Sequence, residues 1–501
     1  MSVSTTPEGQ IRHVLLMTNS EYGQANTFIA LAHALAIQPN VNVHFASFID
    51  AESRVIGLKD ALQATGTLGA GSMITFHNVD GPSVKMVAVD SLKSWSIDHP
   101  PGFWGALKSY SVVTTHIFSW TPEQYMMGVN SAIRIIEDID PAAIVIDTAF
   151  SQGIDGCRKS GRKYIAAGPM SLKDTVLTLQ PRFLANYSIM ASGYQYPLQW
   201  SQVVPNIILT LSLTYNLLTC PRMKLINDTR KAFGLDGMLP LFGGFQKDVE
   251  YLAPMIPELD FPLTVIPQNI TLCGPFILPV THTVAHNDAE LAQWLKDSNG
   301  RTILVNLGTH AIVNTTNTRE LAKAFSAVIQ HERIHGRSLQ ILWKLQLVPG
   351  SEVDEILKEE LGSEIKIGIV RVVDWLAVDP IAILQQGNII CSIHHGGANS
   401  FFEGIMTGTP HIVLPRWYDC YDYANRVEYL HVGIYGNRTA APDTNSEELT
   451  TAVIKIIASG SEYITRAKQL AALCQGKCGG RELGAKRILK AAEEMLSRVH
   501  I

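Results

Sequence analysis

A glycine-rich segment between an expected strand and an expected helix constrains the fold of this chain more than any other feature. The apolar run Gly387–Ile393 is typical of a buried strand, the letters HHGG follow at positions 394–397, and a helix is expected from about Ser400. Glycine lets the backbone approach a ligand closely, and a helix N-terminus offers unpaired N–H groups and a partial positive charge. The segment therefore predicts an α/β fold with an anion site at the end of this strand.

Side chains that follow the glycines could bind other parts of a nucleotide. Asn399 and Ser400 add donors for phosphate oxygens, and Glu403, one helical turn later, can accept from a pair of ribose hydroxyls. The alternative is an ordinary strand-to-helix turn in which Asn399 or Ser400 caps the helix. The length of the ordered run favours a diphosphate site.

The spacing from His395 to Asp419 resembles the donor-binding signature of family 1 glycosyltransferases, which move a sugar from a UDP-sugar to a small lipophilic acceptor. Letters such as TNSEYGQAN at positions 18–26 look like the fungal natural-product branch. In that family a His and an Asn/Ser pair face the diphosphate, a Glu binds ribose and a Trp stacks on uracil. The resemblance implies a nucleotide-sugar site made of Trp375, His395, Gly397, Asn399, Ser400, Glu403, Asp419 and Thr309.

Alternation of strands and helices predicts two doubly wound, Rossmann-like domains facing across a cleft, the GT-B architecture of the family that the chain resembles. Strands are expected at 12–17, 41–48, 142–147 and 163–167, and again at 301–309, 341–345 and 411–414. Between the first two strands we expect a glycine-bearing turn and then a helix from about Thr27 to Ala36.

The expected domain boundaries follow from this alternation and from the resemblance. Residues 1–275 form an N-terminal acceptor-binding domain, and 276–290, rich in Pro, His and Thr, form a linker. Residues 291–480 form the C-terminal nucleotide-sugar-binding domain. Residues 481–501 form a final helix that packs back on the first domain.

The catalytic pair of the family is altered in this chain. Transfer to an alcohol needs a base, because an alcohol is a poor nucleophile at neutral pH. In the family that base is a His after the first glycine turn, and an Asp at the end of a later strand holds it. The resemblance puts Asp147 at the Asp position but Gln24 at the His position, and an amide cannot accept a proton near pH 7.

Two donor positions also depart from the family pattern. Cys420 stands beside Asp419 where the family has a Gln that bonds sugar hydroxyls, and Val378 stands where a Gln follows the uracil-binding Trp. The phosphate and ribose elements are therefore more complete than those for base and sugar.

Aromatic-rich, irregular segments at 80–125 and 181–244 are expected to wall an apolar acceptor pocket in the first domain. Its predicted lining includes Trp104, Trp120 and Trp200, and Trp95 lies in the same segments. The apolar stretch 203–220 is interrupted by polar residues and by Pro205, so we expect a buried helix that covers this pocket. Peripheral contact with a membrane is the alternative.

Composition excludes several classes of function. A chain of 501 residues with a net charge of −5 offers no basic field for nucleic acid. The first ten residues lack the apolar core of a signal peptide, and the seven scattered cysteines suggest no disulfide framework, so a cytoplasmic enzyme is expected. No metal and no cofactor are expected apart from the UDP-sugar co-substrate, because a helix N-terminus can neutralise the leaving diphosphate.

Three functional hypotheses follow. The first is a hexosyltransferase that uses another base or an acidic acceptor. The second is a repurposed fold that acts as a cyclase or isomerase, such as a pericyclase, on a lipophilic natural-product intermediate, with Gln24 and Asp147 binding the substrate. The third is a carrier for a lipophilic metabolite. The complete run from His395 to Glu403 favours the first.

Overall fold

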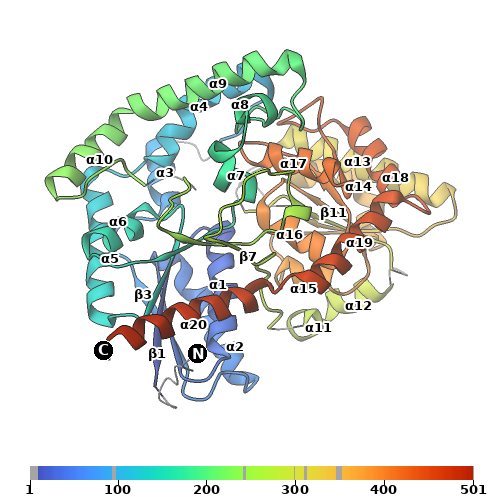
Figure 1. Ribbon diagram of the computed structural model, residues 1–501. Helices are drawn as coiled ribbons and strands as arrows, with labels where there is room; N and C mark the ends of the chain where they lie inside the picture. The colour runs from blue at the N-terminus through green and yellow to red at the C-terminus, as the bar shows by residue number, and fades with distance from the viewer. Residues whose placement is uncertain are drawn as a thin grey trace.

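The computed structural model describes residues 10–92, 97–240, 244–281, 283–297, 300–309, 313–345 and 352–499, which form two parallel sheets covered by helices (Figure 1). The seven-stranded sheet has the order β3-β2-β1-β4-β5-β6-β7, and the six-stranded sheet has the order β10-β9-β8-β11-β12-β13. Every strand pairing described is parallel. The two sheets match the expected GT-B class, whereas the domain boundaries at 275, 290 and 480 stay predictions.

The elements of the two sheets have the following bounds. The first sheet consists of β1 Arg12–Met17, β2 Val41–Ser47, β3 Met73–Asn78, β4 Ala143–Asp147, β5 Ile165–Ala167, β6 Glu250–Ala253 and β7 Ile270–Leu272. The second sheet consists of β8 Thr302–Asn306, β9 Gln340–Lys344, β10 Val370–Val373, β11 Ile389–His394, β12 His411–Val413 and β13 Gly433–Tyr435. The central strands, such as β1, β4, β8 and β11, are buried on both faces, as their continuous apolar runs require, whereas the edge strands β3 and β10 are partly exposed.

Helices join these strands and cover both sheets. In the first half they are α1 Tyr22–Ala36, α2 Glu52–Ala64, α3 Val84–Leu92, α4 Gly102–Ile117, α5 Pro122–Ile139, α6 Ser151–Lys159, α7 Leu172–Val176, α8 Phe183–Asn186, α9 Trp200–Thr219 and α10 Pro221–Ala232, with short 3₁₀ turns η1 Ile49–Ala51, η2 Leu177–Leu179 and η3 Pro257–Leu259. In the second half they are α11 Val284–Asn287, α12 Ala289–Asp297, α13 Thr315–Ile334, α14 Val353–Lys366, α15 Pro380–Leu384, α16 Ala398–Thr407, α17 Cys420–Tyr429, α18 Ser446–Ile457, α19 Glu462–Lys477 and α20 Gly480–Val499.

The strand order reverses direction at one point in each sheet, and predicted site residues lie at both of these switch points. In the first sheet the order reverses between β1 and β4, and in the second it reverses between β8 and β11. Ligands in open parallel sheets bind at the carboxyl ends of such neighbouring strands. Asp147 is the last residue of β4, and the segments after β1, β8 and β11 contain the start of α1, Thr309 and His395.

The C-terminal helix α20 runs across the first half of the molecule, against α1, β1 and β4 (Figure 1). Its Glu493 pairs with Arg12 of β1 at 3.0 Å. The last helix thus joins the end of the chain to its first strand.

The first helix begins earlier than the sequence predicts. Its N-cap is Glu21, so Gly23 and Gln24 lie in the first turn of α1 and the expected glycine turn before Thr27 is absent. Gly23 has no unusual backbone angle, and no atom lies within 4 Å of a Cβ built on it. The helix begins here because residue 21 has the extended backbone of an N-cap and the chain can turn directly into the helix.

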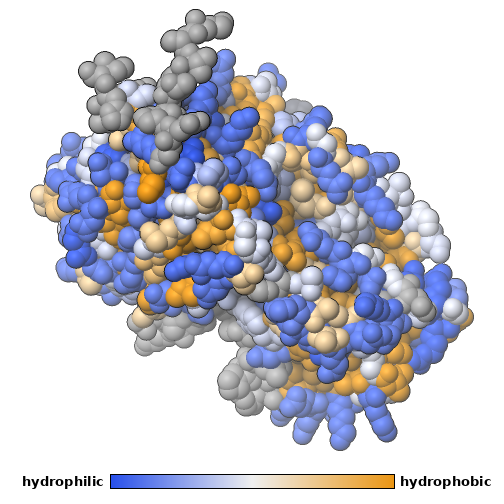
Figure 2. Space-filling view, turned by 90° about the horizontal axis from the view of Figure 1, so that it is seen from below, coloured by the Kyte–Doolittle hydropathy of each residue, from blue (hydrophilic) through white to orange (hydrophobic). Residues whose placement is uncertain are grey.

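The helix α9 lies along the top edge of the molecule in Figure 1, beside α4. It was expected to be buried, and this is only partly correct. Its face toward α4 is covered and Leu213 reaches the cavity described below, but Val204, Leu211 and Tyr215 are exposed. Figure 2 shows the molecule from below, where hydrophilic residues dominate the surface of both lobes.

Among the described residues, no single helix has the length and apolar character to cross a membrane. The bent pair α9 and α10 meets this requirement only when the two helices are taken together, by length and composition.

Candidate functional site

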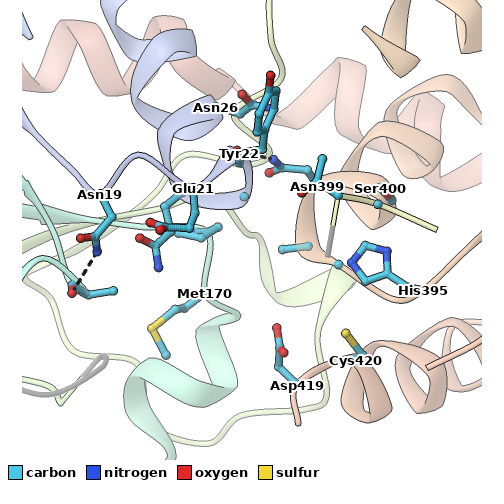
Figure 3. A pocket seen from close by; sticks show the side chains of 18 of the residues that line it. Asn19, Glu21, Tyr22, Asn26, Met170, His395, Asn399, Ser400, Asp419 and Cys420 are labelled. Carbon is cyan, nitrogen blue, oxygen red and sulfur yellow. Dashed lines mark hydrogen bonds between the residues drawn. The ribbon is translucent and has the colours of Figure 1, made fainter. Parts of the chain in front are cut away.

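One large cavity, of about 840 Å³, lies between the two halves at the carboxyl ends of both sheets. Its volume falls in the usual range for small-molecule sites. The first half contributes the start of α1, Asp147 and parts of α4, α7, α9 and α10, and the second contributes the ends of β8 and β9, the start of α16 and the segment 417–423. Figure 3 shows Asn399, Ser400 and His395 on one side of this space and Asn19 and Glu21 on the other.

The start of α16 has the geometry expected of an anion site. Gly397 is its N-cap and the helix runs from Ala398 to Thr407. Gly396 has φ of 96°, and a Cβ there would lie 2.8 Å from the carbonyl oxygen of Cys420. Only glycine therefore fits this turn, which directs the first N–H groups of α16 into the cavity.

The ring of His395 is enclosed by two glycines. A Cβ on Gly308 or on Gly397 would lie 2.5 or 2.7 Å from atoms of this ring, and Trp417 packs against it at a centroid distance of 5.5 Å. The absence of side chains on both sides leaves room for the imidazole at the start of α16. His395 thus lies beside the start of α16, and its contact with a diphosphate stays a prediction.

The neighbouring His394 has a structural position. It is buried, its Nε2 lies 3.0 Å from Nδ1 of His411, and its Nδ1 accepts a hydrogen bond from the N–H of Gly396 at 3.1 Å. Burial, together with His411, holds the pKa of His394 well below its usual value. A neutral His394 therefore supports the glycine turn.

Glu403 and Trp375 line the other end of this half of the cavity. The Glu403 side chain is only 6% exposed, and burial, with a contribution from Asp379, raises its pKa to about 8. Trp375 is half exposed, and the Nζ of Lys344 lies 3.8 Å from the centre of its ring. Burial lowers the pKa of Lys344 to about 8.

Lys344 was not identified from the sequence. Its Nζ donates to the carbonyl of Gly308 at 3.1 Å, so it joins the end of β9 to the loop after β8. A lysine near the end of the apolar strand expected at 341–345 was the available signal. It supplies a cation next to the predicted nucleotide site.

The two predicted catalytic residues, Gln24 and Asp147, line the same cavity but differ in their hydrogen bonding. Asp147 is fully buried and accepts hydrogen bonds from Oγ1 of Thr18 at 2.8 Å and from the N–H of Ala149 at 2.9 Å. Burial raises its pKa to about 6. The Oε1 of Gln24 is shielded from solvent and has no hydrogen-bond partner within the described part of the chain.

Glu21 also lines the cavity and was not selected from the sequence. Its Oε1 accepts from the N–H of Lys85 at 3.2 Å. Burial is the largest cause, with nearby Asp147 and Asp50, of a pKa raised to about 7. An acid directly before a helix, within the letters TNSEYGQAN, was the signal that could have found it.

A charged cluster joins the two halves at the base of the cavity. Lys173 of α7 lies 3.0 Å from Asp174 and also pairs with Asp422 of α17. Asp419 lines the cavity beside this cluster with an exposed side chain, and desolvation within the cleft, with Asp174 and Asp422 nearby, raises its pKa. Cys420 is buried beside it.

Of the predicted acceptor-pocket residues, only Trp120 lines the cavity, and its Nε1 donates to the carbonyl of Pro82 at 2.9 Å. The prediction for Trp104 and Trp200 is wrong, because they are 69% and 93% exposed on the outer faces of α4 and α9. Trp95 lies outside the described residues. Aliphatic and other aromatic side chains form the apolar wall instead: Ile97, Val113, Ile117, Phe118, Ile189, Met190, Leu213, Ile226 and Leu239.

The nucleotide-sugar residues predicted from the sequence do come together. Trp375, His395, Gly397, Asn399, Ser400, Glu403, Asp419 and Thr309 all line the one cavity. Their binding roles stay predictions. In the part of the chain that the structure covers, no group of three His, Cys, Asp or Glu side chains is arranged to hold a metal ion.

Known proteins resemble this chain in sequence and in fold. The family described as "Erythromycin biosynthesis protein CIII-like, C-terminal domain" matches residues 354–483. The chain is 32% identical to "Glycosyltransferase sdnJ" of Sordaria araneosa over 94% of its own length and 96% of that protein.

Two solved structures share the fold. A UDP-glucosyltransferase from Polygonum tinctorium, described as capable of glucosylating indoxyl and solved as a complex with 3,4-dichloroaniline, superposes with a TM-score of 0.62 at 16% identity, covering 98% of this chain and all of that one. The glycotransferase of kitacinnamycin superposes with a TM-score of 0.61 at 15% identity, covering 96% of this chain and all of that one.

Proposed function

The chain belongs to the family 1 glycosyltransferases, and on this basis we propose that it transfers a sugar from a UDP-sugar to a lipophilic small-molecule acceptor of secondary metabolism. Membership of the family implies a transferase. The identity of donor and acceptor is the part that we propose.

The observation that carries the proposal is the division of one cavity into two unlike parts. At one end, the start of α16, His395 and Glu403 offer groups suited to a diphosphate and a ribose. At the other end, α4, α9 and α10 supply an apolar wall with few charges. A polar donor and a lipophilic acceptor would thus meet between the two halves.

In the proposed reaction the acceptor oxygen forms a bond to the anomeric carbon of the sugar. The bond from that carbon to the diphosphate breaks, and its electron pair leaves with UDP. The N-terminus of α16 and His395 would stabilise the charge that develops on the leaving diphosphate. Holding donor and acceptor in one enclosed space supplies the orientation that the displacement needs.

Calorimetry with UDP and a panel of UDP-sugars tests the donor half. We expect UDP to bind, and Asn399→Ala to weaken binding by about 1 to 3 kcal/mol, because a side-chain donor to the diphosphate is lost. Asn216→Ala on α9 is the matched control, since Asn216 lies outside the cavity lining and bonds only within its own helix. No binding of UDP at millimolar concentration would contradict the proposal.

Mass spectrometry tests the transfer itself. Purified protein is incubated with an extract of lipophilic metabolites, with and without UDP-sugars. A donor-dependent gain of one hexose or deoxyhexose is the expected result. A product of the same mass as its substrate, formed without donor, would instead favour a cyclase or isomerase.

A further inference from the structure

We propose that Glu21 is the catalytic base that takes the proton of the acceptor hydroxyl, the role for which Gln24 is unsuited. The inference rests on the proposed function, because a base is needed only if an acceptor hydroxyl attacks a sugar. It depends on where Glu21 lies, on what its carboxyl group contacts, and on the charges around it.

The backbone of Glu21 is held firmly at the start of α1. Its carbonyl accepts from the N–H groups of Gln24 at 3.0 Å and Ala25 at 2.9 Å, which makes it the N-cap of the helix. The side chain makes no capping bond to α1. It instead lies along the cavity, where Oε1 accepts from the N–H of Lys85.

The next residue contacts the predicted diphosphate site. The Nδ2 of Asn399, in the first turn of α16, donates to the carbonyl of Tyr22 at 3.4 Å. The N-termini of α1 and α16 therefore meet across the cleft, and Figure 3 shows Tyr22 and Asn399 side by side between Glu21 and His395. Glu21 directly precedes Tyr22 in the chain, and Tyr22 contacts the helix start at which a leaving diphosphate would bind.

One oxygen of the Glu21 carboxyl group, Oε2, still lacks a donor among the residues described. This oxygen and the Oε1 of Gln24 are both shielded from solvent, and neither has a hydrogen-bond partner among the residues described. The two side chains belong to the N-cap and the third residue of one helix, positions that lie on the same face. Because buried polar groups are normally satisfied, two acceptors without a donor indicate a site for a hydroxyl group of a ligand.

The other acid at this end of the cavity is less suited to the role. Both oxygens of Asp147 already accept hydrogen bonds, from Thr18 and from Ala149, and the group is completely buried. Neither oxygen of Asp147 is therefore without a donor, in contrast to Oε2 of Glu21. The charge of Asp147 still acts on Glu21.

The charges around Glu21 suit a base that works at neutral pH. Among the described residues, the ionisable side chains that interact with it include Asp147 from β4, Asp50 from η1 and Arg54 from α2. Burial and the two aspartates raise its pKa to about 7. A general base is most effective when its pKa lies near the pH at which it operates.

In the proposed step Glu21 is ionised when the acceptor binds. As the acceptor oxygen bonds to the anomeric carbon, its proton moves to the carboxylate of Glu21. The bond to UDP breaks and the electron pair leaves with the diphosphate. Glu21 ends protonated and returns its proton to solvent after product release.

The test compares wild type with Glu21→Gln, an isosteric change, in the full chain. With an alcohol acceptor we expect kcat to fall about 10²- to 10⁴-fold, the usual contribution of a general base. The KM for the UDP-sugar should stay nearly constant. With a nitrophenol acceptor that is already ionised at the assay pH, the loss should be much smaller, since no proton has to be removed.

The pH dependence gives a second readout that a purely structural role would not produce. Wild-type kcat/KM should fall as the pH drops below about 7, because protonation inactivates the base, and Glu21→Gln should lack this limb. The control is Asp50→Asn, an exposed acid outside the cavity lining. It should keep its turnover at pH 8 and move the limb to lower pH, since the charge of Asp50 raises the pKa of Glu21.

Three outcomes would overturn the inference. One is full turnover of Glu21→Gln with the alcohol, and another is an equal loss with the alcohol and with the ionised phenol. In both cases sugar transfer by wild type leaves the proposed function standing. If wild type transfers no sugar to any acceptor although UDP binds to it and to the variant, the proposed function fails and the role of Glu21 fails with it.

Discussion

We predict that donor binding depends on pH through Glu403, and calorimetry can measure this directly. Burial raises the pKa of Glu403 to about 8, so without ligand the side chain is mostly protonated at pH 7. Two ribose hydroxyls would donate to the ionised form, and binding should therefore expel the proton. Affinity for the donor should rise with pH up to about 8 and level off above it.

The magnitude follows from the pKa. One pH unit below the pKa, ionising the group costs about 1.4 kcal/mol, so donor binding at pH 7 should be about tenfold weaker than at high pH. Another unit lower should weaken binding about tenfold again. Glu403→Gln has no titrating group at this position, so its affinity should be weaker than that of wild type at pH 8.5 but nearly independent of pH.

Calorimetry at pH 6.5, 7.5 and 8.5, in two buffers of different ionisation enthalpy, measures both affinity and proton release. UDP-glucose is the better probe, because the terminal phosphate of free UDP titrates in the same range. Glu447→Gln, an exposed acid in the first turn of α18, should behave like wild type. The reasoning is refuted if wild type binds equally well at all three pH values, or if Glu403→Gln keeps the same pH dependence.

Three further predictions concern the turn, the catalytic end and the interface between the halves. Gln24→His should retain or raise sugar transfer in a turnover assay, because an imidazole near Asp147 is a second proton acceptor; lower transfer would argue against a base at this end of the cavity. Gly396→Ala should lower the midpoint of thermal unfolding and weaken UDP binding, since its Cβ would lie 2.8 Å from a backbone oxygen. Gly57→Ala in α2 is the control; it has open space around it and should be neutral or stabilising. Lys173→Ala should cost about 3 to 5 kcal/mol in urea unfolding, because Asp422 would stay buried without its paired cation and with Ser188 as a hydrogen-bond donor. Lys224→Ala, in an exposed pair with Asp228, should change stability little.

The sequence alone was sufficient for the features that depend on short stretches of chain. Alternating strands and helices gave the α/β class and the two sheets, since hydrophobic periodicity and turn residues act locally. The run from His395 to Glu403 could be assigned to a strand end, a turn and a helix start for the same reason. The resemblance then added the residues of the donor site, which do line one cavity.

Only the tertiary structure decided which side chains face the cavity from the first half of the chain. Trp104 of α4 and Trp200 of α9 were expected inside but are exposed. In α9 no charged residue marks the exposed face, so its sequence does not show which side meets solvent. Glu21 and Lys344 were overlooked because their neighbours in the cavity come from segments far away in sequence. Asn399 contacts Tyr22, the residue after Glu21, and Lys344 lies over the ring of Trp375. Such contacts arise when two sheets close over a common space, and no local pattern encodes which residues meet there.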